Sequence, residues 1–469
     1  MIAIPLWQFF LLLGGSGVTL VWFLLYPSVR WVLRRRVNRL IHQLNDSLDF
    51  KLPPFKLSKR QALINALIVD PQILAAAKAW AEQEGLPLEV ARKRVLAYSS
   101  EIVPSFNAYF YFKLGSWLSR KLSQAIYRIR LGKIEEQALA QIPEQATIVF
   151  VLNHRSNMDY ILVSHFASSR TAISYAVGEW ARIWPLQGLI RSLGAYFVRR
   201  QSDDPLYRKV LEKYVQMATQ GGVTQAIFLE GKLTRDGHLN PPKLGLLDYM
   251  LRDYNPGQQR DIVFLPVGIN YDRVLEDRSL QLARGKSPKM VKKVRITAGF
   301  LTKIVVRRFF GQWFRFGYAS VNFGAPFSLQ KHLASQQIEL RDMDKDTRMQ
   351  KVQHLAEQLM ERVQNIIPVL PVSLVACAFV QAGEATLSLL ELKVKIHRTM
   401  QDFESQGVHI YLPRGDMDYA IEVGLRMLTL RHFVTEDQGL YQRVEAERPL
   451  LEYYANSIAH YHSPAESLI

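Results

Sequence analysis

Residues 147–167 read TIVFVLNHRSNMDYILVSHFA, and this stretch decides the fold. Its first part, TIVFVLN (147–153), is a continuous apolar run, which is typical of a strand buried on both faces of a sheet. A short polar segment follows, and the apolar residues after it are spaced as in a helix. This strand-to-helix order predicts one unit of an α/β sheet.

Similar apolar runs recur downstream, with helical patterns such as LYRKVLEKYVQMATQG (206–221) between them. The further predicted strands are TAISYAV (171–177), GAYFVRR (194–200), QAIFLEG (225–231), DIVFLPVGINY (261–271) and YASVNFGAPFSL (318–329). Buried strands that alternate with helices predict an α/β domain over residues 131–330, with a largely parallel central sheet flanked by helices.

The regions on either side of this domain, residues 46–130 and 331–469, are predicted to be helical. In VDPQILAAAKAWAEQEG (69–85), Asp70 is a predicted N-cap and Gly85 a stop signal. The aromatic-rich stretch FNAYFYFKLGSWLSRKLSQAIYRI (106–129) is read as a helix, which either lies along a bilayer surface or packs in the core.

The N-terminal residues 1–45 are predicted to anchor the chain in a membrane. Residues 6–26, LWQFFLLLGGSGVTLVWFLLY, carry no charge and are long enough to span a bilayer. Five arginines follow in residues 30–39 and no Lys or Arg precedes, so the positive-inside rule places the rest of the chain in the cytoplasm, at the cell (inner) membrane. Because glycines interrupt the middle, a buried or monotopic helix is the alternative.

The composition favours some partners and excludes some kinds of site. The 469 residues carry 59 Lys and Arg against 42 Asp and Glu, a formal net charge of +17, which points to an anionic partner. No recognition helix or base-stacking motif accompanies the charge, so we expect no nucleic acid partner. Cys377 is the single cysteine, which excludes intramolecular disulfides and multi-cysteine metal sites. No metal-ligand spacing is visible, and we expect neither a metal nor a cofactor.

A cationic stretch over residues 284–295 has two readings. It either docks an acidic carrier protein or anionic lipid, or is a solvated basic loop.

The best candidate for catalysis is a His-x4-Asp pair, His154 and Asp159. The sequence holds two more such pairs, at His397 and His432, but neither follows a predicted strand. His154 does, and ligands of open α/β sheets gather at the carboxyl ends of strands. A strand-to-helix turn can bring Asp159 back to the imidazole and orient it as a general base for a hydroxyl, with backbone donors of the turn available for an oxyanion. A structural histidine is the alternative.

Cations follow the next predicted strands. Arg199 and Arg200 end GAYFVRR, where we expect one to bind phosphate and the other a carboxylate, Asp203 or Asp204. The later loop FLEGKLTR (228–235) and the lysine after Pro242 supply the remaining predicted substrate-binding residues, Glu230, Gly231, Lys232, Arg235 and Lys243. Together with the His–Asp pair, this set suits the transfer of an acyl group to a phosphorylated alcohol.

The segments HRSNMDYILVSHFA, GAYFVRR, FLEGKLTRDGHLNPPKLGLL and LPVGINYDRVLE resemble, in this order, the four motifs of the membrane-bound glycerol-3-phosphate and dihydroxyacetone-phosphate acyltransferase family. The similarity extends over residues 60–462. It implies an α/β acyltransferase domain and transfer of a fatty acyl group from acyl-CoA or acyl-carrier protein to the 1-hydroxyl of glycerol 3-phosphate. The product would be lysophosphatidate, a precursor for phospholipid synthesis, and membrane lipids would be partners.

The resemblance also implies roles for individual residues. His154 would be the general base and Asp159 its orienting partner, while Arg155 and Ser156 help to shape the site. The other motif residues would serve substrate binding: Arg199, Arg200, Glu230, Gly231, Arg235 and Tyr271, with Pro266 also in the fourth motif.

One residue departs from the family pattern. Leu233 stands where the third motif usually has an arginine, with Lys232 beside it as a possible substitute. This leaves dihydroxyacetone phosphate or lysophosphatidate open as the acceptor. A membrane-tethered lipid-binding protein without catalysis is the alternative from another class.

Overall fold

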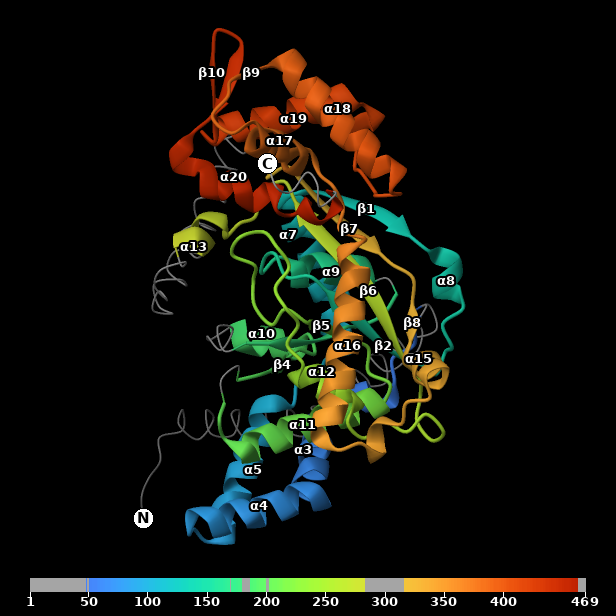
Figure 1. Cartoon of the computed structure of the whole chain (residues 1–469). Helices are drawn as coiled ribbons and strands as arrows, with labels where there is room; N and C mark the ends of the chain where they lie inside the picture. The colour runs from blue at the N-terminus through green and yellow to red at the C-terminus, as the bar shows by residue number, and fades with distance from the viewer. Residues whose placement is uncertain are drawn as a thin grey trace, which may run out of the picture.

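A computed structural model describes residues 48, 50–168, 170–178, 186–199, 202–282 and 316–462. Its centre is a sheet in the order β1-β7-β6-β2-β5-β3-β4, with β8 paired to β6. In chain order the strands are β1 (Arg128–Ile134), β2 (Thr147–Leu152), β3 (Ser174–Val177), β4 (Tyr196–Phe197), β5 (Gln225–Phe228), β6 (Ile262–Tyr271), β7 (Tyr318–Phe323) and β8 (Phe327–Ser328). In Figure 1 the sheet lies between the helices of residues 60–102 at one end of the molecule and those of residues 371–455 at the other.

The predicted α/β domain with a largely parallel sheet is confirmed, since five of the seven strand pairings described in this sheet are parallel. β2 pairs in parallel with β5 and β6, and its residues are buried throughout, as the continuous apolar run predicts. However, β7 and β8 both pair antiparallel to β6, so the sheet is mixed. Residues 324–326 connect β7 to β8, so both antiparallel partners of β6 follow one another in the chain.

Helices cover both faces of the sheet. Val149 and Val151 of β2 face a core that includes residues of α4 (Pro71–Glu84), α5 (Leu88–Ile102), α11 (Pro205–Gln220), α12 (Gly245–Leu251) and α16 (Lys345–Gln364). Ile148 and Phe150 face a core with residues of α9 (Asp159–Ala167) and α17 (Pro371–Ala382). This alternation along one strand is the period of two expected for a β-strand. The helices within and beside the sheet are α8 (Glu136–Ala140), α9 (Asp159–Ala167), α10 (Leu186–Ser192), α11 (Pro205–Gln220), α12 (Gly245–Leu251) and α13 (Asp277–Leu282).

The N-terminal helices form as the sequence predicts over most of their length. Asp70 caps α4 by accepting from the backbone N–H groups of Gln72 and Ile73, and Gly85 ends it with a φ of 65°. The helices here are α2 (Pro54–Leu57), α3 (Arg60–Ile68), α4 (Pro71–Glu84), α5 (Leu88–Ile102), α6 (Ala108–Phe110), the π-helix η1 (Tyr111–Gly115) and α7 (Ser116–Ile126).

The predicted helix over 106–129 is wrong at its C-terminal end. The chain leaves α7 after Ile126 and enters β1 at Arg128, where pairing with β7 provides backbone hydrogen-bond partners. These two strands are far apart in the sequence, so no local sequence pattern predicts their pairing.

The C-terminal region is helical, as predicted, but it also contains a small antiparallel sheet in the order β10-β11-β9. Its elements are α15 (Leu329–Gln336), η3 (Leu340–Asp342), α16 (Lys345–Gln364), α17 (Pro371–Ala382), β9 (Leu387–Ser388), α18 (Leu389–Ser405), η4 (Pro413–Gly415), α19 (Met417–Leu430), β10 (Val434–Asp437), β11 (Leu440–Arg443), η5 (Glu445–Glu447), α20 (Arg448–Ala455) and η6 (Ala459–Tyr461). Residues 438–439, between β10 and β11, both have a positive φ, which is characteristic of tight hairpin turns.

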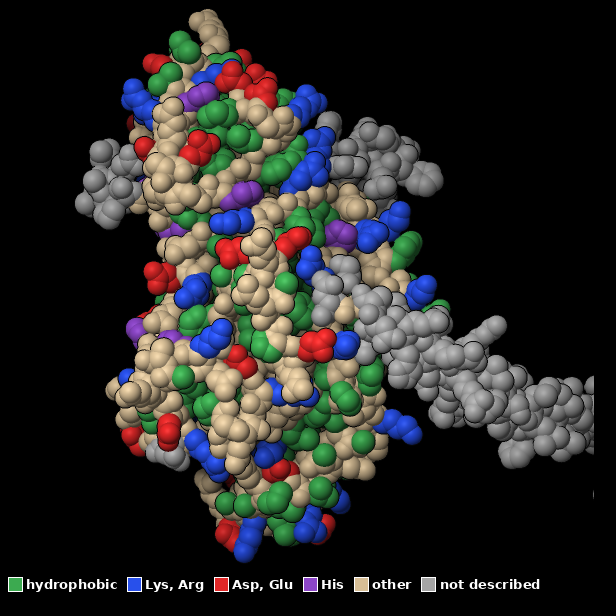
Figure 2. Space-filling view, turned by 90° about the vertical axis from the view of Figure 1, so that its right-hand side faces the viewer, with side chains coloured by type: hydrophobic (Ala, Val, Ile, Leu, Met, Phe, Trp, Pro, Cys, Tyr) green, Lys and Arg blue, Asp and Glu red, His purple; other side chains and the backbone are tan. Residues whose placement is uncertain are grey.

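The predicted anchor over residues 1–45 and the basic stretch 284–295 lie outside the described residues. Among the described helices, none alone has the length and apolar composition to cross a membrane; α3 and α4 meet the criterion as a pair, with a bend of 57° between them. On the face in Figure 2, Lys and Arg side chains are spread among Asp, Glu and hydrophobic side chains.

A buried carboxyl group joins three elements near the end of β6. Asp272 accepts from the backbone N–H of Tyr318 in β7, at 2.8 Å, and from that of Val372 in α17, at 3.1 Å. Burial raises the pKa of Asp272 to about 7, although both hydrogen bonds oppose the shift.

The raised pKa predicts a pH dependence of stability. In the unfolded chain the pKa of an Asp carboxyl is about 3.9, so the folded chain binds the proton of Asp272 more tightly. The resulting contribution to the free energy of unfolding is complete below the unfolded pKa and is lost as the pH rises to the folded pKa of about 7. Asp272→Asn carries no titrating group, so its thermal unfolding midpoint should vary less between these two pH values than that of the wild type. The exposed Asp402→Asn serves as the control and should keep the wild-type slope; equal slopes for all three proteins would contradict this.

Candidate active site

The turn after β2 brings His154 and Asp159 together. The Nδ1 atom of His154 lies 2.9 Å from Oδ2 of Asp159, and both side chains are buried. Since a carboxylate accepts, Nδ1 carries the proton, which leaves the lone pair of the neutral imidazole on Nε2. No described residue forms a hydrogen bond to Nε2. The predicted pairing is therefore present, in the orientation that a general base requires.

Asp159 is held by three further donors. The backbone N–H groups of Arg155 and Ser156 donate to Oδ2, at 2.8 and 3.0 Å, and the hydroxyl of Tyr271 donates to Oδ1, at 2.7 Å. Tyr271 stands at the end of β6, beside β2, so the sheet itself positions this hydroxyl. The prediction that Tyr271 binds substrate is corrected, because its hydroxyl is fully buried and occupied by Asp159.

Glu230 fixes His154 from the other side. One carboxylate oxygen accepts from the backbone N–H of His154, at 2.7 Å, and the other accepts from the backbone and side-chain nitrogens of Asn240, at 2.7 and 2.8 Å. Burial raises the pKa of Glu230, and these hydrogen bonds counteract that shift. Glu230 was predicted to bind substrate; its bonds show that it positions the His154 backbone and the 230–240 loop.

Glu276, which the sequence reasoning did not single out, secures the rest of the turn. It accepts from the Ser156 hydroxyl at 2.7 Å, and from the backbone and side-chain nitrogens of Asn157 at 3.1 and 2.9 Å. Ser156, grouped with the substrate-binding residues because the resemblance implies that it shapes the site, is thus a fully buried positioning residue. The available signal was the place of Glu276 at the end of LPVGINYDRVLE, five residues after the neighbouring strand β6 ends at Tyr271.

The backbone donors of this turn are all in use. His154 N–H donates to Glu230, those of Arg155 and Ser156 to Asp159, and that of Asn157 to Glu276. The Met158 N–H donates to the Ser156 hydroxyl oxygen. The expectation that this turn supplies an oxyanion hole is therefore wrong for these donors, because three carboxylates and the serine hydroxyl already accept their hydrogen bonds.

Arg155 is also held by the protein. Its guanidinium donates to the carbonyl of Gly237, at 3.0 Å, and lies 6.0 Å from the ring centroid of Tyr453. Gly237 has a φ of 94°, and a Cβ there would come within 2.0 Å of the Tyr453 carbonyl, so only glycine fits. Arg155 thereby ties the turn after β2 to the 230–240 loop and α20.

Aromatic rings surround the imidazole. The ring centroid of Phe228, at the end of β5, lies 4.1 Å from that of His154, and the centroid of Tyr160 lies 5.7 Å away. The planes of the Phe228 and His154 rings are 32° apart, so Phe228 packs against the imidazole, whereas Tyr160 meets it edge-on at 85°.

Exposed cations stand on the loop that Glu230 anchors. Lys232, Arg235 and Lys243 all reach solvent, in contrast to the buried Arg155. Gly231 has a φ of 65°, and a Cβ there would lie 3.0 Å from Cγ of Lys243, so this glycine allows the lysine to pass close to the loop. These three side chains remain candidates for contact with a phosphorylated substrate.

Arg199 forms an ion pair with a glutamate of the N-terminal helices. Its guanidinium forms a two-pronged pair with Glu101 of α5, at 2.9 and 2.6 Å, which raises the pKa of Arg199. The predicted carboxylate partners were Asp203 and Asp204, and this is corrected: Asp204 caps α11 instead. β4 also ends at Phe197, before the arginines. Arg200 lies outside the described residues.

The two other His-x4-Asp pairs do not form. His397 lies on α18 and faces Asp418, at 3.6 Å, rather than Asp402. His432 follows α19 in a turn with a φ of 60°. Among the residues that the structure describes, no three His, Cys, Asp or Glu side chains gather in a way that suits a metal ion.

The bonds of Glu230 predict a large stability effect. Glu230→Ala leaves the buried N–H of His154 without an acceptor, so the free energy of unfolding should fall by about 3 kcal/mol, as estimated from lost hydrogen bonds to a charged group. Urea denaturation measures this, with Glu404→Ala on the exposed side of α18 as the control. A loss no greater than that of the control would show that Glu230 does not hold the turn.

Comparisons with known proteins show which families the chain is similar to. Residues 133–270 match the acyltransferase family model, and residues 305–465 match the model of the glycerol-3-phosphate acyltransferase C-terminal region. The chain is 29% identical to glycerol-3-phosphate acyltransferase of Pseudomonas syringae over 419 residues, covering 86% of this chain and 49% of that protein. For the Aeromonas hydrophila protein of the same name, the identity is 30% over 423 residues, with 86% and 50% covered.

The chain spans about half the length of these curated relatives. Among solved structures, the 1-acyl-sn-glycerophosphate acyltransferase of Thermotoga maritima is 18% identical, with a TM-score of 0.32, covering 54% of this chain and 82% of that one. The two family models thus match separate stretches of the chain, one described as acyltransferase and one as the C-terminal region of glycerol-3-phosphate acyltransferase.

Proposed function

We propose that the chain transfers a fatty acyl group from acyl-CoA or acyl-carrier protein to the 1-hydroxyl of glycerol 3-phosphate, forming lysophosphatidate for phospholipid synthesis. The observation that carries this is the His154–Asp159 pair, with Nδ1 bound to the carboxylate and Nε2 left without a protein partner among the described residues. The names of the curated relatives support the choice of acceptor.

The proposed reaction uses His154 twice. Nε2 takes the proton of the acceptor hydroxyl while its oxygen attacks the thioester carbonyl, and Asp159 stabilises the resulting imidazolium. The carbon–sulfur bond then breaks, the ester forms, and Nε2 returns the proton to the departing thiolate. Neither step requires a cofactor.

The acceptor phosphate would be bound by the exposed cations of the 230–243 loop. Lys232, Arg235 and Lys243 follow β5, the strand next to β2, so their loop starts at the sheet edge where His154 stands. Leu233 stands among them, so acceptor choice depends on how well the two lysines replace an arginine.

A membrane location follows from the same proposal, since the product is a lipid. The N-terminal segment over residues 1–45 would anchor the chain, with the catalytic domain on the cytoplasmic side of the inner membrane. Exposed apolar side chains near α7 support contact with a bilayer: Tyr109, Leu114, Trp117 and Leu118.

Loss of the base tests the reaction directly. His154→Ala should lower kcat by about 10²–10⁴-fold, because general-base catalysis typically contributes that much. The assay uses the full chain in lipid nanodiscs, follows thioester consumption and identifies the product. His397→Ala, from a His-x4-Asp pair that does not form, is the matched control. Wild-type turnover by a folded His154→Ala protein would refute the proposed base.

The acceptor contact has its own test. Lys232→Ala, Arg235→Ala and Lys243→Ala should each raise the KM for glycerol 3-phosphate, by about tenfold for a lost charged contact, with a smaller change in kcat. Dihydroxyacetone phosphate and lysophosphatidate serve as competing acceptors. An unchanged KM in all three variants would remove the loop from phosphate binding, and preference for another acceptor would replace glycerol 3-phosphate in the proposal.

A further inference from the structure

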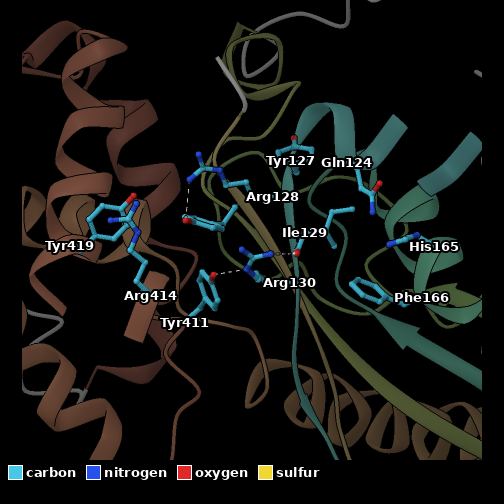
Figure 3. Close-up of a pocket in the computed structure, with 11 residues that line it drawn as sticks. Gln124, Tyr127, Arg128, Ile129, Arg130, His165, Phe166, Tyr411, Arg414 and Tyr419 are labelled. Carbon is cyan, nitrogen blue, oxygen red and sulfur yellow. Dashed lines mark hydrogen bonds between the residues drawn. The ribbon is translucent and has the colours of Figure 1, made fainter. Parts of the chain in front are cut away.

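A cavity of about 550 Å³ lies apart from the His154–Asp159 pair, at the edge of the sheet formed by β1. Its walls come from the end of α7, from β1 and β7, from the end of α9, and from the segment 411–419 of the C-terminal region (Figure 3). Neither His154 nor Asp159 lines it. The catalytic chemistry proposed above leaves this cavity without a role.

Three arginines converge on the cavity, and no carboxylate lines it. Arg128 and Arg130 lie two positions apart on β1, so they share a side of the strand, whereas Arg414 comes from the distant loop. Among the described residues, none of the three forms an ion pair with Asp or Glu. Uncompensated positive charge in a concave site favours an anion.

The arginines are positioned by tyrosines. Arg130 donates to the hydroxyl of Tyr411, at 2.6 Å, and Arg128 to that of Tyr318, at 3.3 Å (Figure 3). The guanidinium of Arg414 stacks 4.2 Å from the ring centroid of Tyr419. A neutral hydroxyl holds a guanidinium in place without cancelling its charge, so donors remain for a ligand.

Two further features of the walls point to a ligand. Arg414 has a φ of 63°, a costly conformation for a non-glycine residue, and such strain concentrates at binding sites. His165 of α9 also lines the cavity, and its buried Nδ1 has no hydrogen-bond partner among the described residues.

Protection of the sheet edge does not account for this arrangement. Charged side chains on an edge strand discourage pairing with another chain, which explains arginines on β1. It does not explain why Arg414, strained and remote in sequence, is brought to the same cavity, or why no carboxylate accompanies them.

We propose that this cavity binds a phosphate group, as a second anion site separate from the catalytic one. Guanidinium groups form paired hydrogen bonds with phosphate oxygens, and three of them match the charge and the several acceptors of a phosphate monoester. The group comes from one of two sources, a soluble phosphate or the headgroup of an anionic lipid. Gln124 at the cavity and the exposed Trp117 are seven residues apart on α7, hence on one helix face, which makes the lipid source accessible.

Hydrogen–deuterium exchange of the full chain in nanodiscs tests the site. One arm adds inorganic phosphate to phosphatidylcholine nanodiscs, and the other uses nanodiscs that contain phosphatidate without added phosphate. In the wild type, peptides covering residues 124–131 and 409–419 should exchange more slowly in at least one arm. Protection by phosphate alone identifies a soluble ligand, and protection only by phosphatidate identifies a lipid headgroup; either supports the site.

Variants test whether the three arginines bind the phosphate group. The triple variant Arg128→Gln, Arg130→Gln, Arg414→Gln should lose the protection, and Arg130→Gln alone should weaken binding about tenfold, as expected for one charge-assisted contact. A control with three exposed cations changed elsewhere, Lys345→Gln, Lys351→Gln, Arg398→Gln, should behave as wild type. Absence of protection in both arms, or equal protection in Arg130→Gln and wild type, would overturn the proposal, whatever the result for acyl transfer.

Discussion

The architecture of the site depends on one buried carboxylate. Asp159 receives hydrogen bonds from the imidazole of His154, from two backbone N–H groups of the turn and from the Tyr271 hydroxyl. A buried charge without such donors would be costly, and here four donors compensate it. The same bonds give the turn its shape and leave one imidazole nitrogen available.

Two glutamates extend this arrangement to the surrounding loops. Glu230 connects the His154 backbone to Asn240, and Glu276 connects Ser156 and Asn157 to the segment after β6. The polar groups around the base are thus largely hydrogen-bonded to each other, and in the proposed reaction the cations that bind the substrate phosphate would come from the exposed part of the 230–243 loop. Several motif residues that the sequence suggests as substrate ligands instead position the general base, His154.

Part of the fold and of the candidate site could be predicted from the sequence. β2 and β6 are mostly apolar and buried throughout, and His154 stood out from His397 and His432 because it follows such a strand. The reversed direction of β7, the pairing of β1 with β7, and the partners of Arg199 and Ser156 could not be predicted in this way. Glu101 and Glu276 lie 98 and 120 residues from those partners, and contacts over such separations depend on packing that no local pattern encodes.

The central claim is that Asp159 holds the neutral imidazole with its proton on Nδ1. Nitrogen-15 NMR of histidine-labelled protein at neutral pH distinguishes the two tautomers directly, with His397→Ala and His154→Ala used to assign the signals. The account predicts a protonated Nδ1 and an unprotonated Nε2 for His154, and loss of this preference in Asp159→Asn. A proton on Nε2 in the wild type, or an unchanged tautomer in Asp159→Asn, would contradict it.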